Sequence, residues 1–251
     1  MDQERTKMAV NITSPVIWIQ RFGICRNLLM AVIRHPAEFR HLPGVLSYYL
    51  TRGHARDQPE RGPFMSYSVI RWLASFLNSE KVVFEYGSGH STLYFAKRAK
   101  FVFSVEHSPE WYNKISDAIT HLNLNNCRLT LLEPEPNNHI TSNDPSDPKA
   151  YLSSKVTQGR LEQYVREIDK LADGSIDLVV VDGRARPSSI LHALDKVKPG
   201  GVLLLDDADR QHYQRSIHLL DTWERMDISG LTYTGAFVFA SAWIKSGVKA
   251  V

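Results

Sequence analysis

Residues 83–92, VFEYGSGHST, place one carboxylate and two glycines at the end of an apolar run. Such a run is typical of a buried strand, and the glycines let the backbone turn tightly and approach a ligand. A helix beginning near His90 would direct free N–H groups at this turn, with Ser91 and Thr92 able to cap it. We therefore expect a ligand-binding loop here, and the alternative is a tight structural turn.

Carboxylates recur at the ends of the other apolar runs. Parallel strands bring their carboxyl ends to one edge of a sheet, where ligands of open α/β proteins bind. Like charges gathered there disfavour one another's ionisation, so this rim predicts a ligand that hydrogen-bonds to the acids, or a cation. The runs end in Glu85, Glu106, Glu133, Asp182, and the pair Asp206 and Asp207.

The spacing around the first glycines distinguishes between two kinds of nucleotide. A dinucleotide fingerprint has three glycines in the order G-x-G-x-x-G, but here Thr92 takes the third position after Gly87 and Gly89. Glu85 would repel a pyrophosphate. Glu106 lies 21 residues further on, where a carboxylate accepts hydrogen bonds from a ribose. These features favour a cationic cofactor without phosphate, and S-adenosylmethionine (SAM) carries a sulfonium and an ammonium group.

The apolar runs alternate with helical patterns after residue 65, which predicts a mostly parallel sheet covered on both faces. Two later runs, 231–237 and 238–246, have no helix between them and predict an antiparallel pair at the sheet edge. The other expected strands cover 81–86, 101–106, 127–133, 176–182 and 201–207, and the expected helices cover 66–77, 90–99, 108–122 and 188–197.

Four motifs in order resemble the class I, Rossmann-like SAM-dependent methyltransferases over about residues 66–246. They are FEYGSGHST, FSVEHSPEW, IDLVVVDGRAR and KPGGVLLLDD. The resemblance implies a doubly wound α/β fold. Its seven-stranded, mostly parallel sheet would have the order 3-2-1-4-5-7-6, with strand 7 antiparallel.

The resemblance also implies roles for individual residues. Glu85, Gly87 and Gly89 would line the methionine end of SAM, and Glu106 its ribose. Residues near Glu133 would flank the adenine, and Asp182 would lie beside the sulfonium and the acceptor. The expected cofactor-binding residues are therefore Glu85, Gly87, Ser88, Gly89, Ser91, Thr92, Glu106, His107, Glu133 and Asp182.

Methyl transfer to a hydroxyl requires close positioning and a base or metal that takes the proton. Asp182, Asp206 and His212 are the candidate catalytic residues. The acids are placed similarly to those of catechol-type O-methyltransferases, which hold magnesium or calcium with an acid and an Asp-Asn pair. Asp182, Asp206 and Asp207 would form that site here, although Asp-Asp departs from the pattern. The alternative is that these acids bind SAM or cap helices.

Arg184 and Arg186 follow Asp182 closely in sequence. Their guanidinium groups can clamp an acidic acceptor, since arginine recognises carboxylates in a bidentate geometry. The alternative is an ion pair with Asp206 or Asp207.

The bulk composition suits a single domain with an appendage. The chain has 251 residues and a net charge of +3 without a dense basic stripe, so nucleic acid is not an expected partner. Its two cysteines fit no metal or redox spacing, which favours a cytoplasmic protein. The polar segment 51–64 predicts a linker. We expect an N-terminal helical extension and linker at 1–62 and a methyltransferase domain at 63–251.

Residues 15–34 form the most apolar long stretch of the chain. Three arginines within it argue against a membrane span. A helix packed on the main domain is expected. The alternatives are a partner-docking helix or an amphipathic helix that contacts a membrane surface, which would make the protein peripheral.

Together these features predict SAM-dependent O-methylation of a small-molecule or glycan-like acceptor. The extension and the 134–160 loop would determine the specificity. Two alternatives remain. One is an aminopropyltransferase-like enzyme on the same fold, and the other is a non-catalytic SAM-binding or membrane-docking module.

Overall fold

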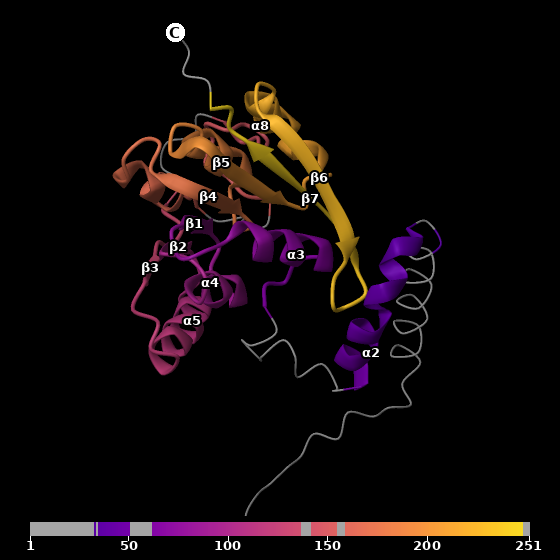
Figure 1. Cartoon of the computed structure of the whole chain (residues 1–251). Helices are drawn as coiled ribbons and strands as arrows, with labels where there is room; N and C mark the ends of the chain where they lie inside the picture. Colours follow the sequence, from indigo (N-terminus) through magenta and orange to yellow (C-terminus); the bar gives the residue numbers. More distant parts are fainter. Residues whose placement is uncertain (1–32, 34, 51–61, 137–141, 155–158, 248–251) are drawn as a thin grey trace, which may run out of the picture.

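A computed structural model describes residues 33, 35–50, 62–136, 142–154 and 159–247 (Figure 1). A seven-stranded sheet has the order β3-β2-β1-β4-β5-β7-β6. Strands β1 to β5 pair in parallel, and β7 is antiparallel to β5 and β6. This confirms the predicted doubly wound sheet. The strands are β1 (Val82–Tyr86), β2 (Phe101–Glu106), β3 (Cys127–Leu131), β4 (Ile176–Val181), β5 (Val197–Asp206), β6 (Glu224–Leu231) and β7 (Phe237–Ile244).

Helices cover both faces of the sheet (Figure 1). On one face lie α3 (Tyr67–Phe76) and α4 (His90–Ala96), and on the other lie α6 (Glu162–Arg166), α7 (Arg186–Ala193) and α8 (Gln214–Ile217). The remaining helices are η1 (Pro36–His41), α2 (Leu42–Leu50), α5 (Pro109–His121), η4 (Glu167–Lys170), η5 (Gln211–Tyr213) and η6 (His218–Leu220).

The protein has one hydrophobic core on each face of the sheet, and the central strand β4 contributes to both. All six of its residues are buried. Successive side chains of a strand point to opposite faces. Val179 and Val181 accordingly pack with α6 and α7, whereas Leu178 and Val180 pack with α3 and α4. This continuous burial is what the apolar run IDLVVV predicted.

Serine caps begin two of the helices, α3 and α5. Ser66 accepts a hydrogen bond from Val69 N at 3.2 Å, and Ser108 accepts one from Trp111 N at 3.4 Å. Each bond satisfies a backbone N–H that has no partner within the helix. Pro109 then occupies the first turn of α5, as expected from sequence.

The predicted position of the first strand of the antiparallel edge pair, residues 231–237, is wrong. The strand β6 covers 224–231, and 232–236 form the turn that leads to β7. Thr232 N donates to Ala236 O at 2.8 Å, and Gly235 has a φ of +78°, which glycine adopts without strain. The sequence ERMDISGL contains several polar residues because β6 is an edge strand of the sheet, with a neighbour on one side only.

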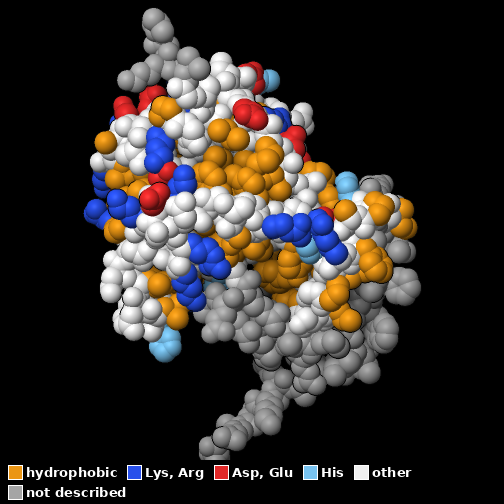
Figure 2. Space-filling view, in the orientation of Figure 1, with side chains coloured by type: hydrophobic (Ala, Val, Ile, Leu, Met, Phe, Trp, Pro, Cys, Tyr) orange, Lys and Arg blue, Asp and Glu red, His pale blue; other side chains and the backbone are white. Residues whose placement is uncertain are grey.

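The N-terminal helices lie beside the β6–β7 turn (Figure 1). The buried carboxylate of Glu38 in η1 accepts a hydrogen bond from Leu231 N at 2.7 Å, and His35 stacks on Phe237 with ring centroids 4.4 Å apart. Large hydrophobic side chains of η1 and α2, including Phe39 and Leu46, are exposed. Figure 2 shows hydrophobic surface in this region.

Residues 15–32 and 34, which carry most of the expected basic helix, lie outside the described residues. The division at residue 62 stays a prediction. No helix among the described residues has the length and hydropathy needed to cross a bilayer.

Candidate active site

A cavity of about 650 Å³ lies at the carboxyl ends of β1, β2 and β4. We call it the large cavity. Among the residues predicted from sequence, those that line it are Gly87, Ser88, Gly89, Ser91, Glu106, His107 and Asp182. Lining residues absent from the predicted set are Phe64, His90, Ser108, Trp111, Lys114, Gly183, Arg184 and Tyr233.

Glu106 holds the glycine loop against the end of β2. Its Oε2 accepts hydrogen bonds from Ser88 N at 3.0 Å and Ser88 Oγ at 3.2 Å. Its Oε1 accepts from the backbone N–H groups of His107 at 2.7 Å and Ser108 at 2.9 Å. Burial alone would raise the pKa of Glu106, but these hydrogen bonds and His107 lower it below its usual value. The carboxylate is therefore ionised at the cavity wall.

Glu85 lies beneath the loop and does not line the cavity. It is fully buried, and the hydroxyl groups of Ser91, Thr92 and Ser104 donate to its carboxylate. Thr92 Oγ1 also accepts from Gly89 N at 3.0 Å. Burial raises the pKa of Glu85 to about 7, against the opposing effect of the three hydroxyl groups. The geometry makes Glu85 an anchor of the loop.

Gly87 and Gly183 bring two loops into backbone contact. Gly87 has a φ of +91°, and a Cβ added there would lie 2.6 Å from Gly183 Cα. A Cβ on Gly183 would lie 2.0 Å from the Tyr164 hydroxyl oxygen. Only glycine fits at these positions, and the contact holds Asp182 beside the glycine loop.

An indole ring forms one wall of the large cavity. Trp111, in the first turn of α5, donates its indole N–H to the carbonyl oxygen of Ser88. The ammonium of Lys114 lies 4.8 Å from the ring centroid. Trp111 lies within FSVEHSPEW, the second motif of the family resemblance, and this motif is the sequence signal for its place at the cavity.

Arg186 neutralises much of the acidic rim. Its guanidinium is 7% exposed and donates to Asp182 Oδ1 at 2.9 Å, to the Asp182 carbonyl at 2.8 Å and to the Gly183 carbonyl at 3.1 Å. It also donates to the carbonyl of Asp206 and lies 3.6 Å from Asp207 Oδ2. The predicted ion pair of Arg186 with Asp207 is present at 3.6 Å, but the closer carboxylate partner is Asp182, which was not predicted.

The Asp182–Asp206 pair retains a proton more readily than isolated carboxyls. Burial raises the pKa of Asp182, opposed by Arg186. Burial and the charge of Asp182 together raise the pKa of Asp206 well above its usual range. Asp206 is buried and does not line the large cavity, and its carboxyl group interacts with that of Asp182.

The predicted magnesium or calcium site at Asp182, Asp206 and Asp207 is not supported. Arg186 takes the position of the cation among these carboxylates, and Arg210 pairs with Asp207. Within the described part of the chain, no three His, Cys, Asp or Glu side chains are arranged to hold a metal ion.

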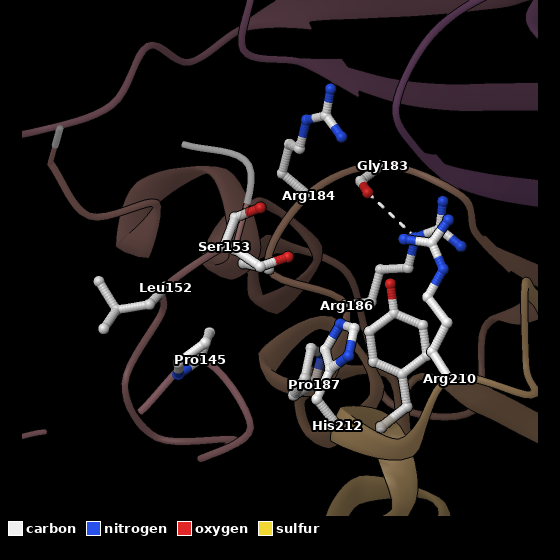
Figure 3. A pocket seen from close by; sticks show the side chains of 12 residues that line it. Pro145, Leu152, Ser153, Gly183, Arg184, Arg186, Pro187, Arg210 and His212 are labelled. Atoms are coloured by element: carbon white, nitrogen blue, oxygen red, sulfur yellow. Dashed lines mark hydrogen bonds between the residues drawn. The ribbon is translucent and has the colours of Figure 1, made fainter. Parts of the chain in front are cut away.

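The remaining two predicted residues lie apart from the large cavity. Glu133 is exposed beyond the end of β3 and is not a lining residue. His212, in η5, lines a second and smaller pocket (Figure 3). Burial, Arg210 and Arg186 lower the pKa of His212, so its imidazole is neutral at neutral pH.

Comparisons with known proteins agree on the fold. Residues 84–208 match a family model described as a methyltransferase domain. The structure is similar to TomG, an O-methyltransferase from Streptomyces achromogenes involved in tomaymycin synthesis and solved in complex with SAM. The TM-score is 0.51 at 15% identity, covering 72% of this chain and 79% of TomG. It is also similar to cofactor-bound Rv0187 from MTB, with a TM-score of 0.52 at 16% identity, covering 78% of this chain and 89% of that chain. No curated protein matches the sequence.

Proposed function

Because the chain belongs to the class I, SAM-dependent methyltransferases, we propose that it methylates an oxygen atom of a small hydroxylated acceptor. One observation carries the proposal. Gly183 and Arg184 line both the large cavity and the His212 pocket, so the two spaces share a wall. A cofactor in the large cavity and the hydroxyl end of an acceptor in the smaller pocket would meet at Gly183, and the neighbouring Asp182 lines the large cavity alone.

The large cavity fits SAM in size and in chemistry. Its volume of about 650 Å³ lies within the range of about 300–1,000 Å³ that holds molecules of this size. Glu106 would accept hydrogen bonds from the ribose hydroxyls, and Trp111 would pack on the adenine. Asp182, which is 28% exposed on its side chain, would face the cationic end. When bound, SAM supplies an electrophilic methyl group.

His212 is the candidate general base. Its neutral imidazole can accept the proton of the acceptor hydroxyl. His212 would take the proton that the acceptor hydroxyl loses as its oxygen receives the methyl group, and Asp182 would face the cationic end of the cofactor. Asp182 and Arg186 position the shared wall, and no metal is required for this route.

The aminopropyltransferase alternative is disfavoured by charge. A diamine acceptor needs acidic side chains, but Arg184, Arg186 and Arg210 line the smaller pocket. These cations would repel a diamine. A small molecule as acceptor, in place of a nucleic acid, is part of the proposal and is supported by the small size of this pocket. A cytoplasmic location, and membrane contact through residues 15–34, stay predictions.

Methyl-labelled SAM and a panel of small alcohols, phenols and amines test the proposal. Mass spectrometry measures the transfer of the label, and the carbon chemical shift of the methyl group identifies the atom that carries it. We expect label on oxygen only. Label on nitrogen or carbon would overturn the O-methylation, and the absence of any turnover with SAM bound would overturn the acceptor class.

A further inference from the structure

The large cavity extends beyond the residues that would hold the cofactor. Glu106, Trp111 and the glycine loop belong to the side of the sheet formed by β1 and β2. Tyr233 also lines the cavity, but it comes from the turn between β6 and β7. In the strand order, β6 and β7 lie on the opposite side of β4 from β1 and β2. The cavity therefore reaches across β4, and its far end is left for a second molecule.

The register of the sheet brings the β6–β7 turn to the same edge as the cofactor loops. Asp206, the last residue of β5, pairs with Ala240 in the antiparallel strand β7. The start of β7 and the turn before it, residues 232–236, therefore lie at the carboxyl end of β5. The parallel strands β1, β2 and β4 end at this edge, where ligands of open α/β sheets bind. The turn is thus part of the active-site edge.

Two aromatic rings form the wall at the far end of the cavity. Phe64 and Tyr233 both line it, and their rings meet edge to face, with centroids 5.1 Å apart and planes at 89°. Tyr233 is 7% exposed, whereas Phe64, which precedes α3, is 45% exposed. We call this pair the aromatic wall. Such a surface favours a further ring in an offset or edge-to-face arrangement.

The N-terminal helices hold the turn that carries Tyr233. Tyr48 of α2 packs on the ring of Tyr233, with centroids 5.2 Å apart. Glu38 of η1 accepts a hydrogen bond from Leu231 N directly before the turn, at 2.7 Å. These contacts fix the turn against two helices, so the aromatic wall is formed before a ligand binds.

Arg184 contributes a planar cation to the same cavity. Figure 3 shows its side chain directed away from the other labelled residues of the smaller pocket. A guanidinium is attracted to the face of an aromatic ring and stacks on it. A saturated ring has no such face and gains neither this contact nor the one with the aromatic wall. The lining therefore favours an aromatic ligand over an aliphatic one of equal size.

We propose that the acceptor carries an aromatic ring, which binds against Phe64 and Tyr233 with its hydroxyl directed toward Gly183 and His212. The inference rests on the proposed function, because it names the chemical class of the acceptor at the same site. It assigns Phe64 and Tyr233 as specificity-determining residues. It also gives the N-terminal helices a role, since Tyr48 positions the aromatic wall.

A phenol fits both ends of this path. Its ring would lie in the large cavity, and only its hydroxyl would enter the smaller pocket. The interior of that pocket is about 20 Å³, compared with about 10–15 Å³ for a single water. A phenolic hydroxyl also loses its proton more readily than an alcohol does, with a pKa of about 10 in tyrosine. A neutral imidazole is therefore a more effective base for a phenol than for an alcohol.

The test compares an aromatic and a saturated ring of similar size. 4-Fluorophenol and 4-fluorocyclohexanol are titrated separately into the full-length protein saturated with S-adenosylhomocysteine, which would occupy the Trp111 end of the cavity. ¹⁹F NMR measures the bound fraction of each. We expect saturable binding of 4-fluorophenol, at least about fivefold tighter than that of 4-fluorocyclohexanol, which is the scale of one aromatic pair.

Three variants assign this preference to the aromatic wall. Phe64→Leu removes a ring and keeps an apolar side chain, so the preference should fall to about twofold or less. Phe64→Tyr keeps the ring and should keep the preference. Phe239→Leu is the matched control and should behave as the wild type does. Phe239 is 44% exposed and meets Phe237 edge to face at 5.4 Å, but it does not line the large cavity.

Three results would overturn the inference. These are equal binding of the two ligands to the wild type, the full preference in Phe64→Leu, or the same loss of preference in Phe239→Leu as in Phe64→Leu. Calorimetry with S-adenosylhomocysteine is a separate readout. If this molecule binds and the ring preference is absent, only the inference fails, whereas a protein that does not bind it contradicts the proposed function itself.

Discussion

Gly87 and Gly183 touch backbone to backbone, so close that a Cβ on Gly87 would lie 2.6 Å from Gly183 Cα. The contact joins the loop after β1 to the loop after β4. The first loop lines the large cavity, and the second separates that cavity from the smaller pocket. In the proposed function, this contact would set the distance between the cofactor and the acceptor.

Gly87→Ala should destabilise the fold by about 3 kcal/mol. Two effects contribute to this loss. An alanine in the left-handed conformation costs about 1–2 kcal/mol, and the added Cβ clashes with the Gly183 backbone, which cannot move aside. Gly200→Ala is the matched control. Gly200 also has a positive φ, +75°, but nothing lies within 4 Å of an added Cβ. Urea unfolding should show a loss of about 1 kcal/mol there, and equal losses at both positions would contradict the close contact.

Glu106→Gln should weaken the binding of S-adenosylhomocysteine (SAH) about tenfold. The amide nitrogen would face backbone N–H groups that now donate to the carboxylate, which disturbs the glycine loop, and the ribose would lose a charged acceptor. Glu133→Gln is the control at the end of the neighbouring strand β3. Glu133 is exposed and does not line the large cavity, so the affinity of the Glu133→Gln variant for SAH should equal that of the wild type. Isothermal calorimetry measures both. Loss of affinity in Glu133→Gln alone would place the ribose elsewhere.

Glu85 should make stability fall as the pH rises. Burial raises the pKa of Glu85 to about 7 from a usual value of 4.5. The folded state therefore holds a proton that the unfolded state has already lost between these two pH values. Its stabilising contribution is complete below pH 4.5 and is lost as the pH rises toward 7, by up to about 3 kcal/mol.

Glu85→Gln removes this titration and keeps the shape of the side chain. Chemical unfolding of both proteins at several pH values gives the difference in stability between them. We expect the wild type to lose stability relative to Glu85→Gln as the pH rises from 4.5 to about 7. A difference that does not vary with pH would mean that Glu85 is ionised throughout.

His212→Gln should reduce the rate of methyl transfer about 100-fold or more, since general bases contribute on that scale. Binding of SAH should be unchanged, because His212 lies outside the large cavity. In the wild type, the rate should fall at low pH with a midpoint below 6.5, because burial and then the neighbouring Arg210 and Arg186 lower the pKa of His212. If the remaining rate of His212→Gln falls at low pH with the same midpoint as the wild type, the general base is another group.

A chelator should leave the rate unchanged. Arg186 already occupies the centre of the Asp182, Asp206 and Asp207 cluster, where a metal would have to displace a buried guanidinium. The assay compares enzyme in EDTA with enzyme in excess magnesium. Loss of activity in EDTA that magnesium restores would overturn this assignment of Arg186.

The central strands could be predicted from sequence because their burial is continuous. In β4, every residue of IDLVVV is buried, and a nearly continuous apolar run of this kind predicts such burial. The outer strand β6 could not be located in the same way. Its residues 224–231 include Glu224, Arg225 and Asp227, which face solvent at the sheet edge, so no apolar run marks them.

The charge balance of the strand-end carboxylates depends on which arginine pairs with them, and the spacing of residues in the sequence does not identify that arginine. The sequence shows acids at the strand ends and two arginines after Asp182. Which arginine turns inward depends on the left-handed turn at Ala185, a conformation that alanine rarely adopts. The sequence therefore left both roles open for Arg184 and Arg186. Only the fold shows that Arg186 is the buried partner of Asp182.

The central claim is that the large cavity binds SAM beside Glu106. A calorimetric titration of the full-length protein with SAH tests it most directly. We predict saturable binding of one molecule per chain, weakened in Glu106→Gln and retained in Glu133→Gln. The absence of saturable binding by the wild-type protein would contradict the account.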